Sequence, residues 1–278
     1  MKYDDIWHRL KAIYEEGEAK AIARYVLDVR FGMSATDIYC GKVTQLSAED
    51  TEELEKIINR LKKSEPVQYI LGTADFVGRT FKVAPGVLIP RPETAELCDW
   101  IVNDNADNKV MKEVLDIGSG SGCIAITLSL DLLSTDVHAW DISSEALKIA
   151  SENARILGAT VSFEIKDAIT PPEDNGKWDI IVSNPPYICD MEKADMDKNV
   201  LEYEPGLALF VPDKDPLLFY RSISEYAINA LKPAGVIYFE INPLYNNETK
   251  DMMSSIGFEN IEEREDMFGK PRFIKARR

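Results

Sequence analysis

The sequence predicts an α/β protein in which a doubly wound, mostly parallel sheet follows a small helical region. Two observations carry this prediction. From about residue 93 onward, short apolar runs alternate with segments of helical periodicity, as in proteins whose parallel strands are joined by single helices. Before that point, the first 65 or so residues contain helical patterns only, and residues 66–92 are rich in Gly and Pro. At 278 residues the chain has room for one large domain and a smaller companion.

The composition narrows the class of protein. Hydrophobic residues make up 45% of the chain and charged residues 29%, as in ordinary folded proteins. The 48 Asp and Glu residues outnumber the 32 Lys and Arg residues, and the net charge of −16 argues against binding nucleic acid through a basic surface. We therefore expect no nucleic acid partner.

The cysteines and histidines predict neither a metal site nor a disulfide framework. The four cysteines are widely spread, and the chain has only two histidines. The N-terminal stretch is charged and lacks the apolar core of a signal peptide. No apolar run approaches the roughly 18 residues that a membrane-spanning helix needs. We expect a cytoplasmic protein that does not associate with membranes.

Residues 1–65 predict a helical domain. Ser47 is followed three residues later by Asp50, which is the outline of a helix capping box. Apolar residues then recur at helical spacing in the segment 54–61, and segments 4–15 and 19–30 show similar patterns. The region carries no catalytic pattern, so we interpret it as a lid or a partner-docking module. The turn formers of 66–92, with short β-prone runs at 81–83 and 87–89, predict a hairpin-like connector.

The remainder of the chain predicts the sheet. We expect strands at 113–117, 136–141, 161–165, 178–182 and 235–241, and helices at 93–103, 122–132, 143–157 and near 215–230. Single helices between strands imply right-handed crossovers and a parallel sheet. Ligands bind to such sheets at the carboxyl ends of the strands.

A glycine loop follows the first of these strands. The segment from Asp116 to Gly122 places glycines at 118, 120 and 122, where the backbone can turn sharply and approach a ligand. A dinucleotide fingerprint would need glycine at 123, which is Cys123, and a phosphate-binding P-loop would need a Gly-Lys-Ser/Thr ending. The remaining pattern resembles the cofactor loop of S-adenosylmethionine-dependent methyltransferases.

Two further acids follow the next strands. Asp141 ends the second strand, where its carboxylate could accept hydrogen bonds from ribose hydroxyls. Asp167 follows the third and could accept a hydrogen bond from an adenine amine, with the backbone of Ala168 beside it. Three acids at the ends of three consecutive strands favour a cofactor site over three isolated helix caps.

The tetrapeptide Asn184-Pro185-Pro186-Tyr187 follows the strand 178–182. To methylate a planar amino or amide nitrogen, a site must hold both N–H hydrogens so that the nitrogen faces the methyl donor. The Asn184 side-chain carbonyl and the Pro185 backbone carbonyl can each accept one of these hydrogen bonds. Because the prolines restrict the backbone, both acceptors are held rigidly. The Tyr187 ring can pack against the substrate or the cationic donor. Adenine, cytosine and glutamine nitrogens all remain possible acceptors of the methyl group at this point.

Over nearly its whole length the chain resembles the HemK/PrmC family of peptide chain release factor glutamine methyltransferases. The resemblance implies a helical N-terminal domain (1–65), a β-hairpin linker (66–92) and a Rossmann-like, seven-stranded methyltransferase domain (93–278). It also implies methylation of the glutamine side chain in the Gly-Gly-Gln loop of class 1 release factors. The segments that carry it are 65–72, 76–81, 87–94, 114–123, 183–187, 203–209 and 266–272.

The resemblance also implies site residues. S-adenosylmethionine would be held by Gly118, Ser119, Gly120, Ser121, Gly122, Asp141, Asp167, Ala168 and Asn184. The substrate glutamine would be held by Asn184, Pro185, Pro186 and Tyr187, of which Asn184, Pro185 and Tyr187 would be catalytic. Arg91, Glu93 and Thr94 would support the site.

The sequence departs from the family's pattern at Ala95, where relatives usually carry an acid, at Ala168, where some place an aromatic, and at Pro216, where glycine is commoner. Two alternatives to the main interpretation remain. The first is an adenine or cytosine methyltransferase acting on DNA or RNA, which shares the tetrapeptide but normally needs a basic recognition surface. The second is a non-catalytic module that uses the fold only for docking.

Overall fold

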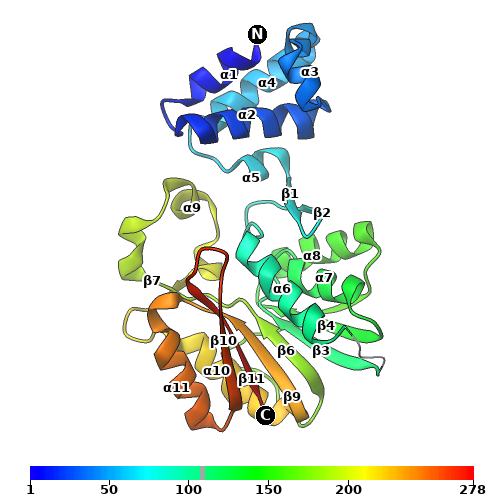
Figure 1. Cartoon of the computed structure of the whole chain (residues 1–278), viewed down its shortest axis with the longest axis vertical. Helices are drawn as coiled ribbons and strands as arrows, with labels where there is room; N and C mark the ends of the chain where they lie inside the picture. Colours follow the sequence, from blue (N-terminus) through cyan, green and yellow to red (C-terminus); the bar gives the residue numbers. More distant parts are fainter. Residues whose placement is uncertain (107–109) are drawn as a thin grey trace. The chain divides into compact units, whose positions relative to one another are not determined.

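The structure is a computed structural model that describes residues 1–106 and 110–278. The chain divides into two units: one comprises Met1–Thr73 and Asp197–Tyr203, and the other comprises Ala74–Met196 and Glu204–Arg278 (Figure 1). More than a hundred residues of chain separate the two segments of the first unit. No local sequence pattern indicates that the segment 197–203 belongs to this unit. Within the described ranges, no helix is long and apolar enough to cross a membrane.

The first unit is a small helical bundle around its own core. Trp7, Leu27 and Ile58 are among the buried side chains of this core. The predicted helix start at Ser47 is confirmed, because its hydroxyl oxygen accepts the backbone N–H of Asp50 at 3.0 Å. The helices are α1 (Tyr3–Leu10), α2 (Glu16–Phe31), α3 (Ala35–Tyr39), the 3₁₀ helix η1 (Lys42–Gln45), α4 (Ala48–Leu61), α5 (Val67–Leu71) and α9 (Lys198–Tyr203).

A two-stranded hairpin follows, formed by β1 (Thr73–Phe76) and β2 (Arg79–Lys82). The two connecting residues, Val77 and Gly78, both have positive φ, 47° and 67°. A two-residue hairpin turn with this geometry matches the twist of its strands. The hairpin lies in the predicted connector, but the β-prone run 87–89 forms no strand. It lies in a loop, where the Ile89 N–H donates to the side chain of Glu204.

The seven-stranded sheet of the second unit has the order β10-β11-β9-β6-β3-β4-β5. Neighbouring strands are parallel from β9 through β5, whereas β11 pairs antiparallel with both β9 and β10. This confirms the predicted doubly wound α/β fold. The strands are β3 (Lys112–Ile117), β4 (Thr135–Asp141), β5 (Val161–Ile165), β6 (Trp178–Ser183), β9 (Leu231–Glu240), β10 (Glu259–Glu265) and β11 (Pro271–Arg277).

Helices cover both faces of this sheet (Figure 1). Because side chains alternate along a strand, Val114 faces one core and Leu115 faces the other. The first core is shared with α6 (Pro92–Asp104), α7 (Cys123–Asp131) and α8 (Ser144–Leu157). The second is shared with α10 (Leu218–Ala230) and α11 (Asn246–Ile256).

Short elements complete the second unit at the carboxyl ends of the strands. They are β7 (Ile188–Cys189), paired with β8 (Phe210–Val211), and the 3₁₀ helices η2 (Asp190–Asp195), η3 (Gly206–Ala208) and η4 (Pro243–Tyr245). The pattern of residues alone did not indicate β10, because this edge strand is charged along most of its length and buries none of its residues.

Candidate active site

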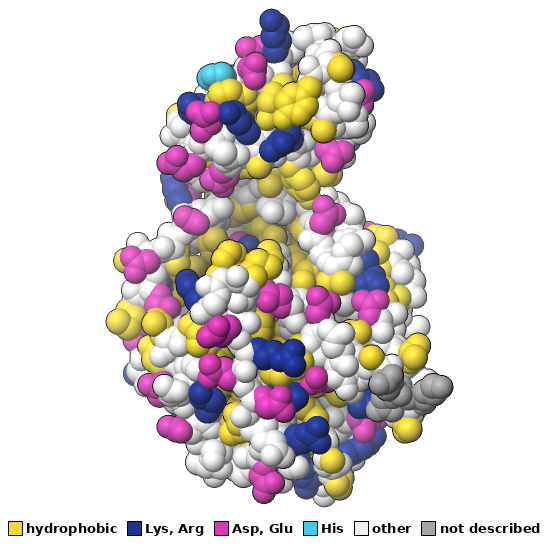
Figure 2. All heavy atoms as spheres, viewed as in Figure 1, with side chains coloured by type: hydrophobic (Ala, Val, Ile, Leu, Met, Phe, Trp, Pro, Cys, Tyr) yellow, Lys and Arg dark blue, Asp and Glu magenta, His cyan; other side chains and the backbone are white. Residues whose placement is uncertain are grey.

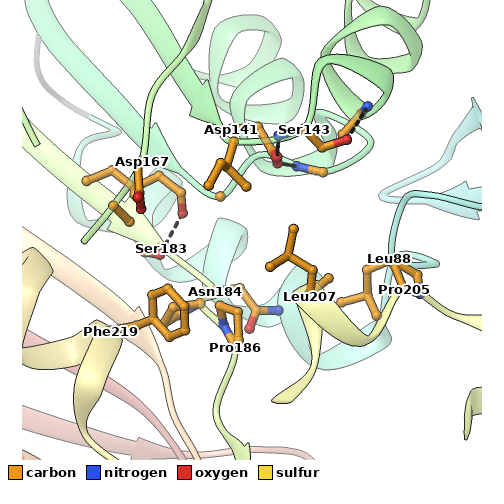
Figure 3. A pocket seen from close by; sticks show the side chains of 18 of the residues that line it. Leu88, Asp141, Ser143, Asp167, Ser183, Asn184, Pro186, Pro205, Leu207 and Phe219 are labelled. Carbon is orange, nitrogen blue, oxygen red and sulfur yellow. Dashed lines mark hydrogen bonds between the residues drawn. The ribbon is translucent and has the colours of Figure 1, made fainter. Parts of the chain in front are cut away.

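A cavity of about 380 Å³ lies at the carboxyl ends of β3, β4, β5 and β6. Its size is that of a small-molecule or cofactor site. In Figure 3, Asp141 and Asp167 lie across this cavity from Asn184 and Pro186, while Leu88, Pro205 and Leu207 gather at one end. Segments that are far apart in the sequence therefore build one pocket, as expected at this edge of a doubly wound sheet.

The glycine loop supplies part of the cavity wall. Gly118 and Gly120 line the cavity with φ of 82° and 53°, a backbone region that favours glycine. Ser119, Ser121 and Gly122 lie outside the lining. A side chain at Gly122 would come within 2.9 Å of the Ile126 side chain, so this glycine serves the packing of α7. The first two glycines approach the cavity, and the rest of the loop supports them.

Asp141 anchors this loop at the end of β4. Its Oδ2 accepts the Gly120 N–H at 2.8 Å, and its Oδ1 accepts the Ser143 N–H, also at 2.8 Å (Figure 3). A carboxylate offers about four lone-pair positions, so each oxygen can accept another hydrogen bond from a ligand. Asp141 also lines the cavity. Its position fits the predicted contact with ribose hydroxyls, and its contacts add a second task, which is to hold the loop.

Asp167, Ala168 and Phe219 form another part of the wall. Asp167 Oδ1 accepts the Ile169 N–H at 2.8 Å, and the Ala168 carbonyl accepts the Ser222 hydroxyl at 2.7 Å, so this turn is fixed on both sides. The small side chain of Ala168 leaves the wall without an aromatic group at that position. Phe219, from α10, supplies an aromatic ring that the sequence did not single out (Figure 3).

The tetrapeptide leaves the end of β6. Asn184, Pro185 and Pro186 line the cavity, whereas Tyr187 lies outside the lining. Directly before it, the Ser183 hydroxyl donates to the Ile117 carbonyl at 2.6 Å, which ties the exit of β6 to that of β3. A Cβ atom added to Gly118 would lie 4.0 Å from the backbone carbonyl oxygen of Asn184. Thus the structure brings the two predicted motifs into contact.

Buried hydrogen bonds connect the tetrapeptide to α6 and β9. Asn184 Nδ2 donates to Thr94 Oγ1 at 3.1 Å, and the Thr94 hydroxyl donates to Glu240 Oε2 at 2.7 Å. The Tyr187 hydroxyl donates to Glu240 Oε1 at 3.1 Å. Burial raises the pKa of Glu240, while the hydrogen bonds from Thr94 and Tyr187 and the charge of Arg272 act to lower it. The predicted support residue Thr94 is therefore part of a network, and sequence reasoning missed Glu240.

A second buried acid, Glu204, joins two rims of the cavity. Its side chain is 1% exposed, and its carboxylate accepts the Ile89 N–H at 3.1 Å and an Arg91 N–H at 2.5 Å. The segment 86–88 precedes Ile89, and residues 205–208 follow Glu204; both contribute to the lining. Arg91 therefore supports the site through Glu204.

Two buried asparagines donate hydrogen bonds to the backbone of the glycine loop and of the tetrapeptide. Asn153 of α8 donates to the Ser121 carbonyl at 2.9 Å, and it also exchanges hydrogen bonds with the backbone of Lys82. Asn242, after β9, donates to the Tyr187 carbonyl at 3.0 Å. Sequence reasoning missed both, because a buried asparagine has no local signature that separates it from the exposed ones.

Asp116, the acid before the glycine loop, is fully buried. Its Oδ2 accepts the Ala125 N–H at 3.2 Å, while its Oδ1 has no hydrogen-bond partner among the described residues. Burial raises the pKa of Asp116 to about 7, and the nearby charge of Asp141 adds to the rise. Asp116 lies outside the cavity lining and braces the start of α7.

The prediction that the site needs no metal remains a prediction. Ligand atoms of Glu113, Asp136 and His138 lie within 4.8 Å of one another. These residues come from the start of β3 and from the start and middle of β4, and none of them lines the cavity at the carboxyl ends of these strands. This group is therefore separate from the candidate active site.

Comparisons with known proteins agree with this architecture. The family profile described as "PrmC N-terminal domain" matches residues 5–72, and that described as "Methyltransferase small domain" matches residues 101–202. The chain is 50% identical over 270 residues to the release factor glutamine methyltransferase of Bacteroides thetaiotaomicron, covering 97% of this chain and 96% of the relative. The chain belongs to the release factor glutamine methyltransferase family.

Other members of the family give the same result, and one solved structure has a similar fold. The chain is 40% identical over 269 residues to the release factor glutamine methyltransferase of Flavobacterium psychrophilum, with 96% of this chain and 94% of the relative covered. It is 37% identical over 269 residues to that of Bacillus subtilis, with 94% and 92% covered. A methyltransferase structure from Pyrococcus furiosus matches with a TM-score of 0.52 at 16% identity, covering 72% of this chain and 89% of that one. The motif-based resemblance and the methyltransferase fold are thereby confirmed.

Proposed function

We propose that this protein transfers a methyl group from S-adenosylmethionine to the side-chain amide nitrogen of the glutamine in the Gly-Gly-Gln loop of class 1 release factors. The observation that carries the proposal is the placement of Asn184 on one cavity wall, facing Asp141 on the other (Figure 3), with Pro185 also in the lining. The full-length similarity to release factor glutamine methyltransferases supports the choice of glutamine over a nucleobase.

The cavity fits S-adenosylmethionine by the chemistry of its walls. Gly118 and Gly120 leave room for a close backbone approach, and Asp141 retains lone pairs for ribose hydroxyls. Phe219 and Ile142 provide apolar surface for a nucleobase, and Asp167 an acceptor for its amino group. When bound, S-adenosylmethionine would supply a methyl group activated by a sulfonium.

The tetrapeptide orients the acceptor. The Asn184 side-chain oxygen and the Pro185 carbonyl oxygen each take one N–H of the glutamine carboxamide, so that the nitrogen faces the cavity. Positive charge that develops on this nitrogen is stabilised by the same two carbonyl dipoles. Most of the rate enhancement should come from this positioning, which can contribute about 7–11 kcal/mol in well-oriented reactions. Pro186 adds rigidity, and Tyr187 acts from outside the lining through Glu240.

The surface supports a protein substrate. On the face drawn in Figure 2, Lys and Arg side chains are interspersed with Asp and Glu side chains. The net charge of −16 adds to the argument, because a nucleic acid methyltransferase must attract a polyanion. We expect the reaction to take place in the cytoplasm, and we expect the helical domain to dock the release factor.

The test is a methylation assay with purified components. The protein is incubated with S-adenosylmethionine carrying a labelled methyl group and with purified class 1 release factors, and the modified residue is mapped by mass spectrometry. We expect one methyl group on the Gly-Gly-Gln glutamine, and none on a release factor in which this glutamine is replaced by alanine. Methylation of duplex DNA or RNA in parallel reactions, without methylation of a release factor, would contradict the proposal. If neither substrate is methylated and calorimetry detects no cofactor binding, the chain is a docking module.

A further inference from the structure

The hydrogen bonds from Asn184 to Glu240 run in one direction. Asn184 follows β6, Thr94 lies in the first turn of α6, and Glu240 ends β9. The two distances along this chain are 3.1 Å from Asn184 Nδ2 to Thr94 Oγ1 and 2.7 Å from Thr94 Oγ1 to Glu240 Oε2. Three separate elements thus meet behind the cavity wall.

The chemistry of Glu240 determines this direction. An ionised carboxylate can only accept hydrogen bonds, and a threonine hydroxyl has a single proton. The 2.7 Å distance fits a hydroxyl that donates to a carboxylate. Once Thr94 has donated this proton to Glu240, its oxygen can only accept from Asn184. The Asn184 amide must then turn its nitrogen toward Thr94 and keep its oxygen for the cavity.

We infer that Thr94 and Glu240 are positioning residues that set the orientation of the Asn184 amide, so that a carbonyl oxygen and not an NH₂ group meets the substrate. This inference rests on the proposed function, because the orientation matters when the substrate presents N–H groups. If the Asn184 amide were reversed, its NH₂ group would meet the NH₂ group of the substrate glutamine. Two donors cannot form a hydrogen bond, so the carboxamide would not be held. Neither positioning residue lines the cavity, and Glu240 is 1% exposed, so Glu240 acts through Thr94.

Tyr187 and Arg272 stabilise the acceptor state of Glu240. The Tyr187 hydroxyl donates to Oε1, the oxygen that Thr94 does not use. Arg272 lies close enough for its charge to favour the carboxylate form, and its Nε donates to Asp266 at 3.2 Å. Both ends of the tetrapeptide are therefore linked by hydrogen bonds to the same carboxylate. Asn184 is linked to it through Thr94, and Tyr187 is linked to it directly. The C-terminal segment 266–272 therefore contributes to the site through Arg272, whose charge favours the carboxylate form of Glu240.

Two substitutions at one position separate positioning from packing. Thr94→Val keeps the shape of the side chain and removes the hydroxyl, whereas Thr94→Ser keeps the hydroxyl. We expect Thr94→Val to lower kcat for release factor methylation by about 10-fold to 100-fold, with the KM for the release factor changed less than about threefold. Thr94→Ser should restore kcat to within about threefold of the unmodified protein. Equal kcat values for the two variants would overturn the inference, as would a loss of S-adenosylhomocysteine affinity that accounts for the whole effect.

A second measurement does not depend on catalysis. In the unmodified protein labelled with ¹⁵N-asparagine, we assign the Asn184 side-chain signals by their absence from Asn184→Asp. One Nδ2 proton should exchange slowly with solvent, because it is bonded to buried Thr94. Rapid exchange of both protons would overturn the inference. If the release factor is not methylated but the slow proton is present, the proposed function fails while the orientation of Asn184 stands.

Discussion

The backbone N–H of Gly120 donates a 2.8 Å hydrogen bond to Oδ2 of Asp141, and this bond joins the glycine loop after β3 to the end of β4. The carboxylate that the sequence assigned to the cofactor is therefore also the one that holds the loop in place. Loop geometry and ligand chemistry are coupled at Asp141, and substitutions there should affect binding through both.

We expect Asp141→Ala to weaken S-adenosylhomocysteine binding by about 10-fold to 100-fold, since hydrogen bonds to charged groups contribute about 1.5–3 kcal/mol. At saturating cofactor, kcat should fall less than the affinity does, because the tetrapeptide is untouched. Isothermal titration calorimetry and steady-state kinetics measure the two effects. The matched control is Glu145→Ala, which removes an exposed acid in the first turn of α8. Unchanged affinity in Asp141→Ala would contradict the ribose assignment.

Asn184→Ala should lower kcat by about 10²-fold to 10³-fold, the usual loss when one donor or acceptor that stabilises a transition state is removed. The reason is that only the Pro185 carbonyl would remain to hold the carboxamide. Single-turnover methylation of a release factor measures the chemical step directly. Asn175→Ala, at an exposed asparagine, is the control. Near-normal turnover of Asn184→Ala would show that the side-chain carbonyl is not needed.

Glu204→Gln should weaken the hydrogen bonds that join the two rims of the cavity, at segments 86–88 and 205–208. The substitution removes the charge that pairs with Arg91 and weakens the bond to the Ile89 N–H. We expect the free energy of unfolding to fall by about 1–3 kcal/mol. Amides in segments 86–91 and 204–209 should exchange faster in hydrogen-exchange mass spectrometry, while the hairpin 73–82 stays unchanged. Glu202→Gln, at an exposed side chain two residues earlier, serves as control. Uniform acceleration throughout the second unit would instead indicate a global effect.

The buried Asp116 should make stability depend on pH. Its pKa is raised to about 7 in the folded protein and is about 3.9 in an unfolded chain. Between these values the folded state binds more protons than the unfolded state, so the contribution of Asp116 to stability is lost as the pH rises through this window. From pH 5.5 to 8, this loss amounts to about 2 kcal/mol.

Urea denaturation at these two pH values tests the assignment. Asp116→Asn lacks the titrating group, so its free energy of unfolding relative to the unmodified protein should be higher at pH 8 than at pH 5.5. The other groups titrate equally in both proteins, so their contributions to the free energy of unfolding cancel in this difference. Asp251→Asn, at an exposed position, should show no such change. If the difference in the free energy of unfolding between the two proteins does not depend on pH, burial does not raise the pKa of Asp116.

Local patterns were sufficient to predict most of the sheet and both chemical motifs. Strands such as 161–165 follow from their alternation of apolar and polar residues, and helices such as 144–157 follow from their periodicity, because both patterns depend on neighbours in sequence. The positions of Asp141 and Asn184 followed from one rule, that parallel strands place their carboxyl ends at the same edge.

The sequence by itself therefore determined the family, the order of the central elements and several of the residues that line the cavity, among them Asp141 and Asn184. Only the tertiary structure decided which polar groups support them. Thr94 and Glu240 are 146 residues apart, and Ile89 and Glu204 are 115 residues apart. Whether a glutamate is buried against a threonine or exposed to water depends on how distant strands and helices pack. That packing, and the cost of leaving a buried polar group unpaired, is a property of the whole fold.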